Sequence, residues 1–134
     1  MKDTGFFATD DIVPNVAIGY TSRGGRTRSN VLQRGASGSA AGSAFATLRD
    51  LLALDESLRN GKLLDPKWTG WFYRSDNPVT GRVMNAENYA GGTGGVNAGV
   101  SGNGTCTVVA TANIDPPAAE ALSSAILRAL AGGK

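Results

Sequence analysis

The stretch from residue 95 to residue 112 constrains the fold of this chain more than any other part of the sequence. Two segments, residues 95–101 and the Val/Thr-rich residues 105–112, flank the tripeptide Gly102-Asn103-Gly104. An Asn-Gly step between two such segments is a strong short-range signal for a β-hairpin. The sequence therefore predicts two antiparallel strands near the C-terminus.

A helix is predicted directly after this hairpin. Asp115-Pro116-Pro117 provides a start signal, and the glycines at 132 and 133 provide a stop. Between them, apolar side chains recur at helical spacing and form one stripe: Ala121, Leu122, Ala125, Ile126, Ala129 and Leu130. The prediction is an α+β fold, with an antiparallel sheet and a packed terminal helix.

Two further helices are predicted upstream. Thr47 and Asp50 form a capping-box-like pair before a leucine-rich helical pattern that Gly61 ends. Asp65-Pro66 looks like the start of a second, shorter helix. This second helix contains a cluster of aromatic residues that we expect in the core: Trp68, Trp71, Phe72 and Tyr73.

The remaining segments are expected to be short strands, loops and turns. Residues 16–22 predict a strand, and the arginine-rich residues 23–34 predict a solvated loop rather than an RNA-binding segment. Residues 35–44 are small and Gly/Ser-rich, which fits either a flexible linker or a packed loop. Residues 76–81 predict a turn.

Composition excludes several classes of function. The sequence has no histidine and a single cysteine, Cys106, so an internal disulfide, the usual zinc-ligand spacings and a Ser-His-Asp triad are ruled out. A net charge of +2 gives no strong field for polyanions or anionic membranes. No apolar stretch suits a membrane span or a signal peptide, and nothing indicates a compartment. We expect one globular domain over residues 1–134, without metal, cofactor or nucleic-acid partner, and with Cys106 buried.

Several short stretches, in the same order along nearly the whole chain, match one family pattern. They are Met1-Lys2-Asp3-Thr4-Gly5-Phe6, Ala17-Ile18-Gly19-Tyr20, Gly38-Ser39-Ala40-Ala41-Gly42, Gly61-Lys62-Leu63-Leu64, Gly91-Gly92-Thr93-Gly94-Gly95-Val96-Asn97-Ala98 and the segment NIDPPAAE at 113–120. Together they resemble the C-terminal half of class C β-lactamases and the related penicillin-binding-protein-like esterases. The resemblance implies part of a β-lactamase/transpeptidase-like fold.

The resemblance also implies a reaction, acyl transfer to a serine during ester or amide hydrolysis. In this family a Ser-x-x-Lys motif supplies the nucleophile and a Tyr-x-Asn motif assists proton transfer. Neither motif occurs in this sequence, and both would precede Met1 in the family order. We therefore expect a portion of a hydrolase that is inactive without that segment.

A third family element, Lys/His-x-Gly on a strand edge, should fall at Tyr89-Ala90-Gly91. A phenol carries no positive charge near pH 7, so recognition of a lactam carboxylate is disfavoured, and an esterase-like pocket or a lost function is favoured. We predict the Gly92 N–H as the oxyanion donor, because a glycine does not crowd the approach to its backbone. The Ser75-Asp76-Asn77 triplet resembles a class A motif, but it stands at the wrong place in the order.

Other interpretations stay open. Residues 91–95 are alternatively a glycine-rich strand entry with a bulge, and Tyr89 is alternatively a packed aromatic residue with a hydroxyl partner. The chain is alternatively a non-catalytic binding or structural module whose exposed sheet edge or apolar face is covered by self-association, as a homo-oligomer or with a partner chain. A third hypothesis is a small hydrolase that uses a serine of residues 37–43, or Ser101 with Tyr89.

Overall fold

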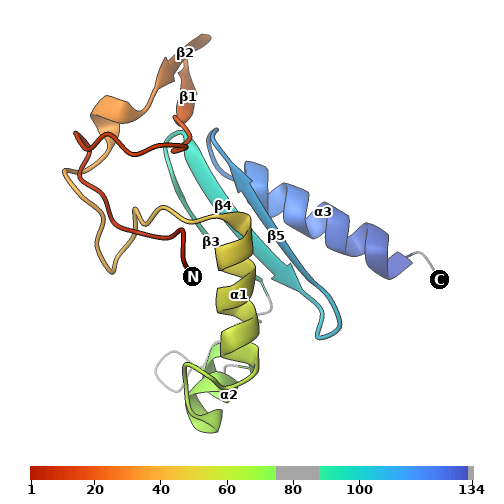
Figure 1. The fold of residues 1–134 in the computed structure, drawn as a ribbon. Helices are drawn as coiled ribbons and strands as arrows, with labels where there is room; N and C mark the ends of the chain where they lie inside the picture. Colours follow the sequence, from red (N-terminus) through yellow and green to blue (C-terminus); the bar gives the residue numbers. More distant parts are fainter. Residues whose placement is uncertain (75–87, 133–134) are drawn as a thin grey trace.

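The computed structural model describes residues 1–74 and 88–132. Its α-helices are α1 (Leu48–Arg59), α2 (Pro66–Arg74) and α3 (Ala118–Gly132), and Val31–Gln33 form a single 3-10 turn. The strands are β1 (Tyr20–Arg23), β2 (Arg26–Ser29), β3 (Asn88–Thr93), β4 (Val96–Gly102) and β5 (Thr107–Ala112). All strand pairs are antiparallel, in a two-stranded sheet and a three-stranded sheet ordered β3-β4-β5 (Figure 1). The predicted α+β class is confirmed.

The hairpin predicted near the C-terminus is β4 and β5. Val100 pairs with Val109, and the strands are joined by a turn in which Gly104 has a φ of 80°. The Asn103 side chain accepts the N–H groups of Thr105 and Cys106 at 3.0 and 2.8 Å. The turn therefore forms for the local reason that the sequence indicated. Cys106, expected to be buried, is exposed because it lies at this turn.

Helix α3 packs on one face of the three-stranded sheet, but with a different side from the one predicted. Ala119 and Ser123 are buried, whereas Leu122 and Leu130 of the predicted apolar stripe are 52% and 60% exposed. Small residues lie at the contact because the helix comes very close to β4. A Cβ on Gly99 would lie 2.9 Å from the Cα of Glu120.

Side chains of β4 also hold the start of α3. The Asn97 Oδ1 atom accepts the N–H of Ala119 at 2.7 Å, which satisfies an amide at the helix N-terminus that has no partner within the helix. Further along, the hydroxyl oxygens of Ser101 and Ser123 lie 2.9 Å apart. The helix is thus positioned by hydrogen bonds to β4 as well as by close packing.

The predicted N-terminus of α1 is confirmed. The Asp50 N–H donates to the Thr47 hydroxyl at 3.2 Å. The Asp50 carboxylate makes a distant contact, since it accepts the Asp3 N–H at 2.8 Å and the Thr4 hydroxyl at 2.7 Å. This carboxylate therefore fastens the N-terminal segment to the start of α1.

Helix α2 also begins where predicted, with the Trp68 N–H donating to Asp65 Oδ1 at 3.0 Å. Its aromatic residues, however, divide between two sides. Trp68 and Trp71 are 49% and 43% exposed and pack edge to face on each other. Tyr73 is half-buried and bonds to α1. The expectation that all these aromatic residues lie in the core is wrong, because only one side of α2 faces the rest of the fold.

The arginine-rich segment predicted as a loop is largely a hairpin. Gly24 and Gly25 have φ values of 57° and 73°, which suit a two-residue turn, and Arg23 pairs with Arg26. The predicted strand at 16–22 is correspondingly shorter and shifted, because β1 begins at Tyr20. Residues 35–44 are a loop with isolated bridges from Ala8 to Ser37 and from Ser39 to Gly42. Of these residues only Gly38 is half-buried and the others are exposed, so the loop is not packed into the fold.

Long-range hydrogen bonds attach the β1–β2 hairpin to the segment that directly follows β5. Asp115 accepts the Thr21 hydroxyl at 3.2 Å and the Ser22 N–H at 3.1 Å. Asn113 donates from its side chain to the Ile18 carbonyl at 3.1 Å. The predicted turn at 76–81, the triplet Ser75-Asp76-Asn77 and the stop glycine at 133 lie outside the described residues.

Candidate functional site

The outer edge of β3 is the region where the sequence predicted a site. Tyr89, Ala90, Gly91 and Gly92 all lie on this strand, and in the described part of the chain β4 is its only neighbour (Figure 1). The structure therefore brings the predicted site residues together on a free strand edge.

The register determines which backbone groups point outward from this edge. Thr93 and Val96 close a turn of two residues, so they exchange backbone hydrogen bonds, and along an antiparallel pair bonded and non-bonded positions alternate. Gly91 and Tyr89 are therefore bonded to β4. The N–H groups of Ala90 and Gly92 point away from β4 into the open side of the sheet.

Close packing against its neighbours also requires a glycine at position 92. A Cβ at this position would lie 2.8 Å from Pro116 Cγ and 2.9 Å from the Asn97 side-chain nitrogen. At Gly91, by contrast, a Cβ would meet no atom within 4 Å. Packing alone thus explains the glycine at 92, whatever its N–H does.

Tyr89 does not extend along the strand edge but crosses the face of the sheet toward α1. Its hydroxyl donates to Asp55 Oδ1 at 3.1 Å, and its ring contacts the Phe72 ring with centroids 5.7 Å apart. The structure thus shows Tyr89 as a packed aromatic residue with a hydroxyl partner. Its phenol is directed away from the outward N–H of Gly92.

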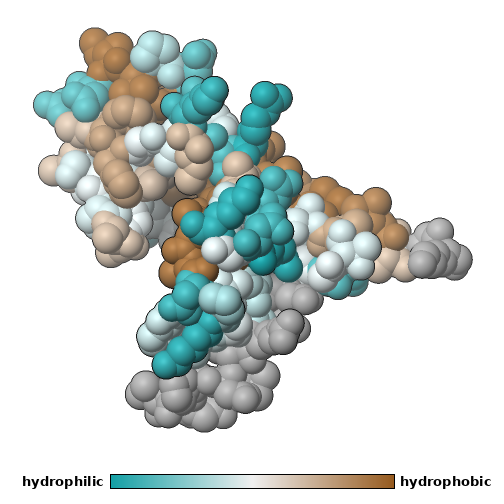
Figure 2. All heavy atoms as spheres, turned by 60° about the horizontal axis from the view of Figure 1, so that its bottom comes forward, coloured by the Kyte–Doolittle hydropathy of each residue, from teal (hydrophilic) through white to brown (hydrophobic). Residues whose placement is uncertain are grey.

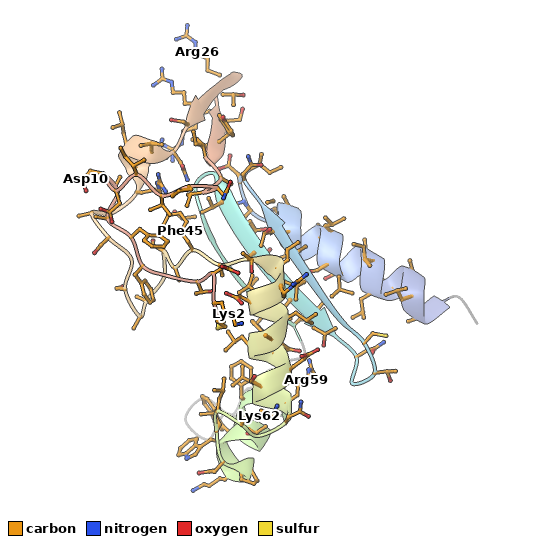
Figure 3. The ribbon with its side chains drawn as sticks, viewed as in Figure 1. Lys2, Asp10, Arg26, Phe45, Arg59 and Lys62 are labelled. Carbon is orange, nitrogen blue, oxygen red and sulfur yellow. The ribbon has the colours of Figure 1, made fainter. Side chains whose placement is uncertain are left out.

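Asp55 is the centre of a polar cluster that includes the Tyr89 hydroxyl, and the sequence analysis did not predict this role. The Asp55 side chain is fully buried. Besides Tyr89, it accepts hydrogen bonds from Tyr73 at 2.9 Å, Thr107 at 3.0 Å and Arg59 Nε at 2.7 Å. One carboxylate therefore ties together α1, α2, β3 and β5. Figure 3 labels Arg59, its partner on α1, near the C-terminal end of this helix.

A sequence signal for this cluster existed. Asp55 stands at helical spacing between Leu51 and Leu58, on the apolar side of the predicted helix. A carboxylate in that position is buried on folding and needs hydrogen-bond donors.

Burial and hydrogen bonding act in opposite directions on the Asp55 carboxyl. Burial alone raises its pKa, but the bonds from Arg59, Tyr73 and Thr107 lower the pKa more, so the net shift is below the ordinary value. Burial and the neighbouring Asp55 charge raise the pKa of Tyr89 well above 10. Tyr89 is therefore neutral near pH 7 and provides no cation at the β3 edge.

Other predicted combinations are not brought together. The Ser101 hydroxyl bonds to Ser123 and Ser124 on the α3 face, whereas the Tyr89 hydroxyl lies on the α1 face. Among residues 1–74 and 88–132, no group of three or more Cys, Asp and Glu side chains is arranged to hold a metal ion. No helix in that part of the chain is long and apolar enough to cross a membrane.

Comparison with solved structures gives a fold. The chain is similar to the penicillin-binding protein of Bacillus halodurans, with a TM-score of 0.68 and 22% sequence identity. The match covers 95% of this chain and 44% of that protein. No family model and no curated protein matches the sequence. The chain therefore has a penicillin-binding-protein-like fold, and it spans less than half the length of this neighbour.

Proposed function

We propose that this chain is the C-terminal portion of a serine hydrolase of the β-lactamase and penicillin-binding-protein type, which cleaves small esters or amides by acyl transfer. In this proposal the chain supplies the oxyanion-binding strand edge. A nucleophilic serine and its base come from residues outside this sequence.

The observation that carries the proposal is the free edge of β3. In a fold similar to that of a penicillin-binding protein, the register directs the Gly92 N–H outward into the open side of the sheet. A backbone N–H in that position can donate to the negative charge that develops on a substrate carbonyl. Fold and register thus support the same strand that the motif order indicated.

The surroundings of Tyr89 favour esters over β-lactams as substrates. Its phenol is neutral and bonded to Asp55, so it offers no positive charge to a substrate carboxylate. An uncharged acyl ester needs no such charge.

The first test uses the chain by itself. Purified protein is incubated with p-nitrophenyl butyrate and with a fluorophosphonate probe, and turnover and intact mass are measured. We expect neither turnover nor an adduct, because the sequence contains no Ser-x-x-Lys and no Tyr-x-Asn motif. An adduct on a mapped serine of this chain would contradict the proposal and support a hydrolase complete in itself.

The second test supplies the absent motifs. The part of the Bacillus halodurans protein left uncovered by the match is joined to this chain, and folding of the chimera is checked by circular dichroism. We expect the fluorophosphonate to phosphonylate, or a fluorescent penicillin to acylate, a serine in the part that comes from the Bacillus halodurans protein. A folded chimera that neither probe labels would contradict a catalytic role for this chain.

Variants at Gly92 separate the N–H from the packing. Gly92→Ala and Gly92→Pro both add a Cβ, but only proline removes the outward N–H. Loss of one oxyanion donor lowers acylation about 100-fold or more. We expect the acylation rate of the chimera to show that loss in Gly92→Pro relative to Gly92→Ala. Equal acylation rates in the two variants would exclude Gly92 as the donor.

A further inference from the structure

The β1–β2 hairpin carries a local positive charge that the net charge of the chain does not show. Residues 12–49 contain five arginines and no acidic residue, although the whole chain has a net charge of only +2. Three of these arginines lie on the hairpin and are exposed: Arg23, Arg26 and Arg28. Among residues 1–74 and 88–132, none of the three forms an ion pair. Their charge therefore faces solvent.

The register of the hairpin places these arginines on one face. Arg23 is directly opposite Arg26, and Thr21 is directly opposite Arg28. Opposite residues of an antiparallel pair share a face, and so do alternate residues of one strand. We call the face formed by Arg23, Arg26 and Arg28 the arginine face. Like charges at opposite positions destabilise a hairpin, so the stability of the hairpin does not explain this arrangement.

The base of the hairpin is fixed to the turn that follows β3. The Asn30 side chain is buried and donates to the Gly94 carbonyl at 3.0 Å. Asp115, which holds β1, also accepts the Gly95 N–H at 2.8 Å. Figure 1 shows the hairpin rising from this end of the three-stranded sheet. The arginine face therefore stands beyond the end of the strand that carries Gly92.

The length of β1 sets the size of a ligand that contacts both places. β1 begins beside the turn, since a Cβ on Gly95 would lie 2.9 Å from the backbone nitrogen of Tyr20. Arg23 is three residues further along the strand, which is about 10 Å at about 3.4 Å per residue. A molecule that contacts both the Gly92 N–H and the arginine face is therefore extended, with on the order of 10 Å between its two contacts.

The arginine face differs from the apolar surfaces that the chain exposes. Figure 2 shows apolar residues along α3 toward its C-terminal end. A chain that spans 44% of its structural neighbour exposes such residues wherever further protein covers them in the longer fold. Guanidinium groups are different, because taking them out of water is unfavourable unless each one meets a carboxylate. The arginine face is therefore suited to water and to anions.

We propose that the arginine face binds an anionic group, a carboxylate or a phosphate, at the far end of an extended substrate. The planar fork of a guanidinium matches both kinds of anion with two parallel hydrogen bonds. The assignment to a substrate rests on the proposed function, in which the ester or amide carbonyl lies at the Gly92 N–H. The reacting carbonyl and the anion are thus bound at separate places, and Tyr89 needs no positive charge.

Binding to the chain by itself tests the anion site without any catalysis. Tripolyphosphate and tricarballylate are titrated by calorimetry at low salt, where charge is little screened. We expect at least one to bind, which identifies the anion, and Arg26→Gln/Arg28→Gln to weaken that binding about 10-fold or more. The control Lys62→Gln/Lys67→Gln removes two charges near α2 and should leave the affinity unchanged. Figure 3 shows Arg26 and Lys62 at opposite ends of the molecule.

Three results of these titrations would overturn the proposal. The first is that the parent chain binds neither anion. The second is equal weakening in the two double variants, which would show a general effect of charge. The third comes from the same titration with double-stranded DNA and with phosphatidylglycerol vesicles. If Arg26 and Arg28 bind either of these more tightly than both small anions, the arginine face serves that partner and not a substrate.

The chimera with the Bacillus halodurans segment tests the link to the reaction. One fluorophosphonate carries the preferred anion on a spacer of about 10 Å, and a second ends in a methyl group instead. We expect the charged probe to label the chimera about 10-fold faster, and Arg26→Gln/Arg28→Gln to remove this difference. Equal rates for the two probes in the parent chimera would overturn the substrate assignment, and this is also the result if further protein covers the arginine face. A chimera that neither probe labels contradicts the proposed function instead, and the titrations of the chain then decide the anion site by themselves.

Discussion

The two outer strands of the central sheet meet their surroundings in different ways. β3 is rich in glycine, carries two outward N–H groups at Ala90 and Gly92, and is tied to α1 through Tyr89. β5 is rich in valine and threonine and is flanked by the apolar side of α3. The same antiparallel pairing thus gives one outer edge rich in glycine and another rich in β-branched residues. Side chains, not topology, make the difference.

Asp55 is shared by the two edges, and its removal should have the largest effect on stability. Asp55→Ala leaves Arg59, Tyr73, Tyr89 and Thr107 without their common acceptor. Breaking a buried ion pair in this way costs about 3 kcal/mol or more. Urea unfolding should show that loss, while the exposed residue in Asp10→Ala should change the free energy of unfolding by less than about 0.5 kcal/mol. Similar losses in the two variants would mean that the cluster does not hold the edges together.

Glycines on the middle and outer strands should differ next. Gly99→Ala forces α3 away from β4, because its Cβ would lie 2.9 Å from the backbone of Glu120. We expect a loss of about 1 to 3 kcal/mol in urea unfolding. Gly91→Ala places its Cβ in open space and should change the free energy by less than about 0.5 kcal/mol. Equal effects would show that α3 is not packed as closely as described.

The pH dependence of stability should depend on the same carboxylate. The pKa of Asp55 is lowered in the folded chain, so its contribution is present above the unfolded value of about 3.9 and is lost as the pH falls through the lower folded value. The free energy of unfolding, followed by urea titration, should therefore fall as the pH drops below about 4.

Asp55→Asn should reduce this fall without abolishing it. The pKa values of Asp50 and Asp115 are lowered too, chiefly by the Thr4 hydroxyl and the Ser22 N–H respectively. A variant with the same acid sensitivity as the parent chain would assign the pH dependence to these other carboxyls.

Proline on each edge makes the smallest change in stability and the sharpest comparison. Ala90→Pro and Thr111→Pro each remove one outward N–H and no bond to β4. We expect both to cost less than about 1 kcal/mol in urea unfolding. A clearly larger loss in either variant would show that its N–H bonds within the fold.

Local chemistry explains what the sequence predicted correctly. The cap at Thr47, the start at Asp65 and the turn at Asn103 each depend on residues within a few positions of one another. The placement of residues 89–92 on a strand edge came from the order of family motifs. The role of the Gly92 N–H stays a prediction.

The errors over the packed side of α3 and over Asp55 share a different cause, which is contact between distant segments. The apolar stripe of α3 was expected to be packed, but Gly99 and Asn97 on β4 select the small residues Ala119 and Ser123 instead. Asp55 finds its partners on three other elements, as far away as Thr107. A helical pattern in a sequence shows which residues share one side of the helix. It does not show which element of the fold that side contacts.

The attachment of the β1–β2 hairpin has a consequence for the order of folding. The bonds from Thr21 and Ser22 to Asp115 span 94 and 93 residues, and the bond from Asn113 to Ile18 spans 95. Contacts at such separation carry a large loop-closure entropy, whereas β3, β4, β5 and α3 follow one another along the chain. Refolding should therefore assemble the three-stranded sheet and α3 first, and the β1–β2 hairpin should dock onto them afterwards. In hydrogen exchange its amides should be the last to gain protection and the first to lose it.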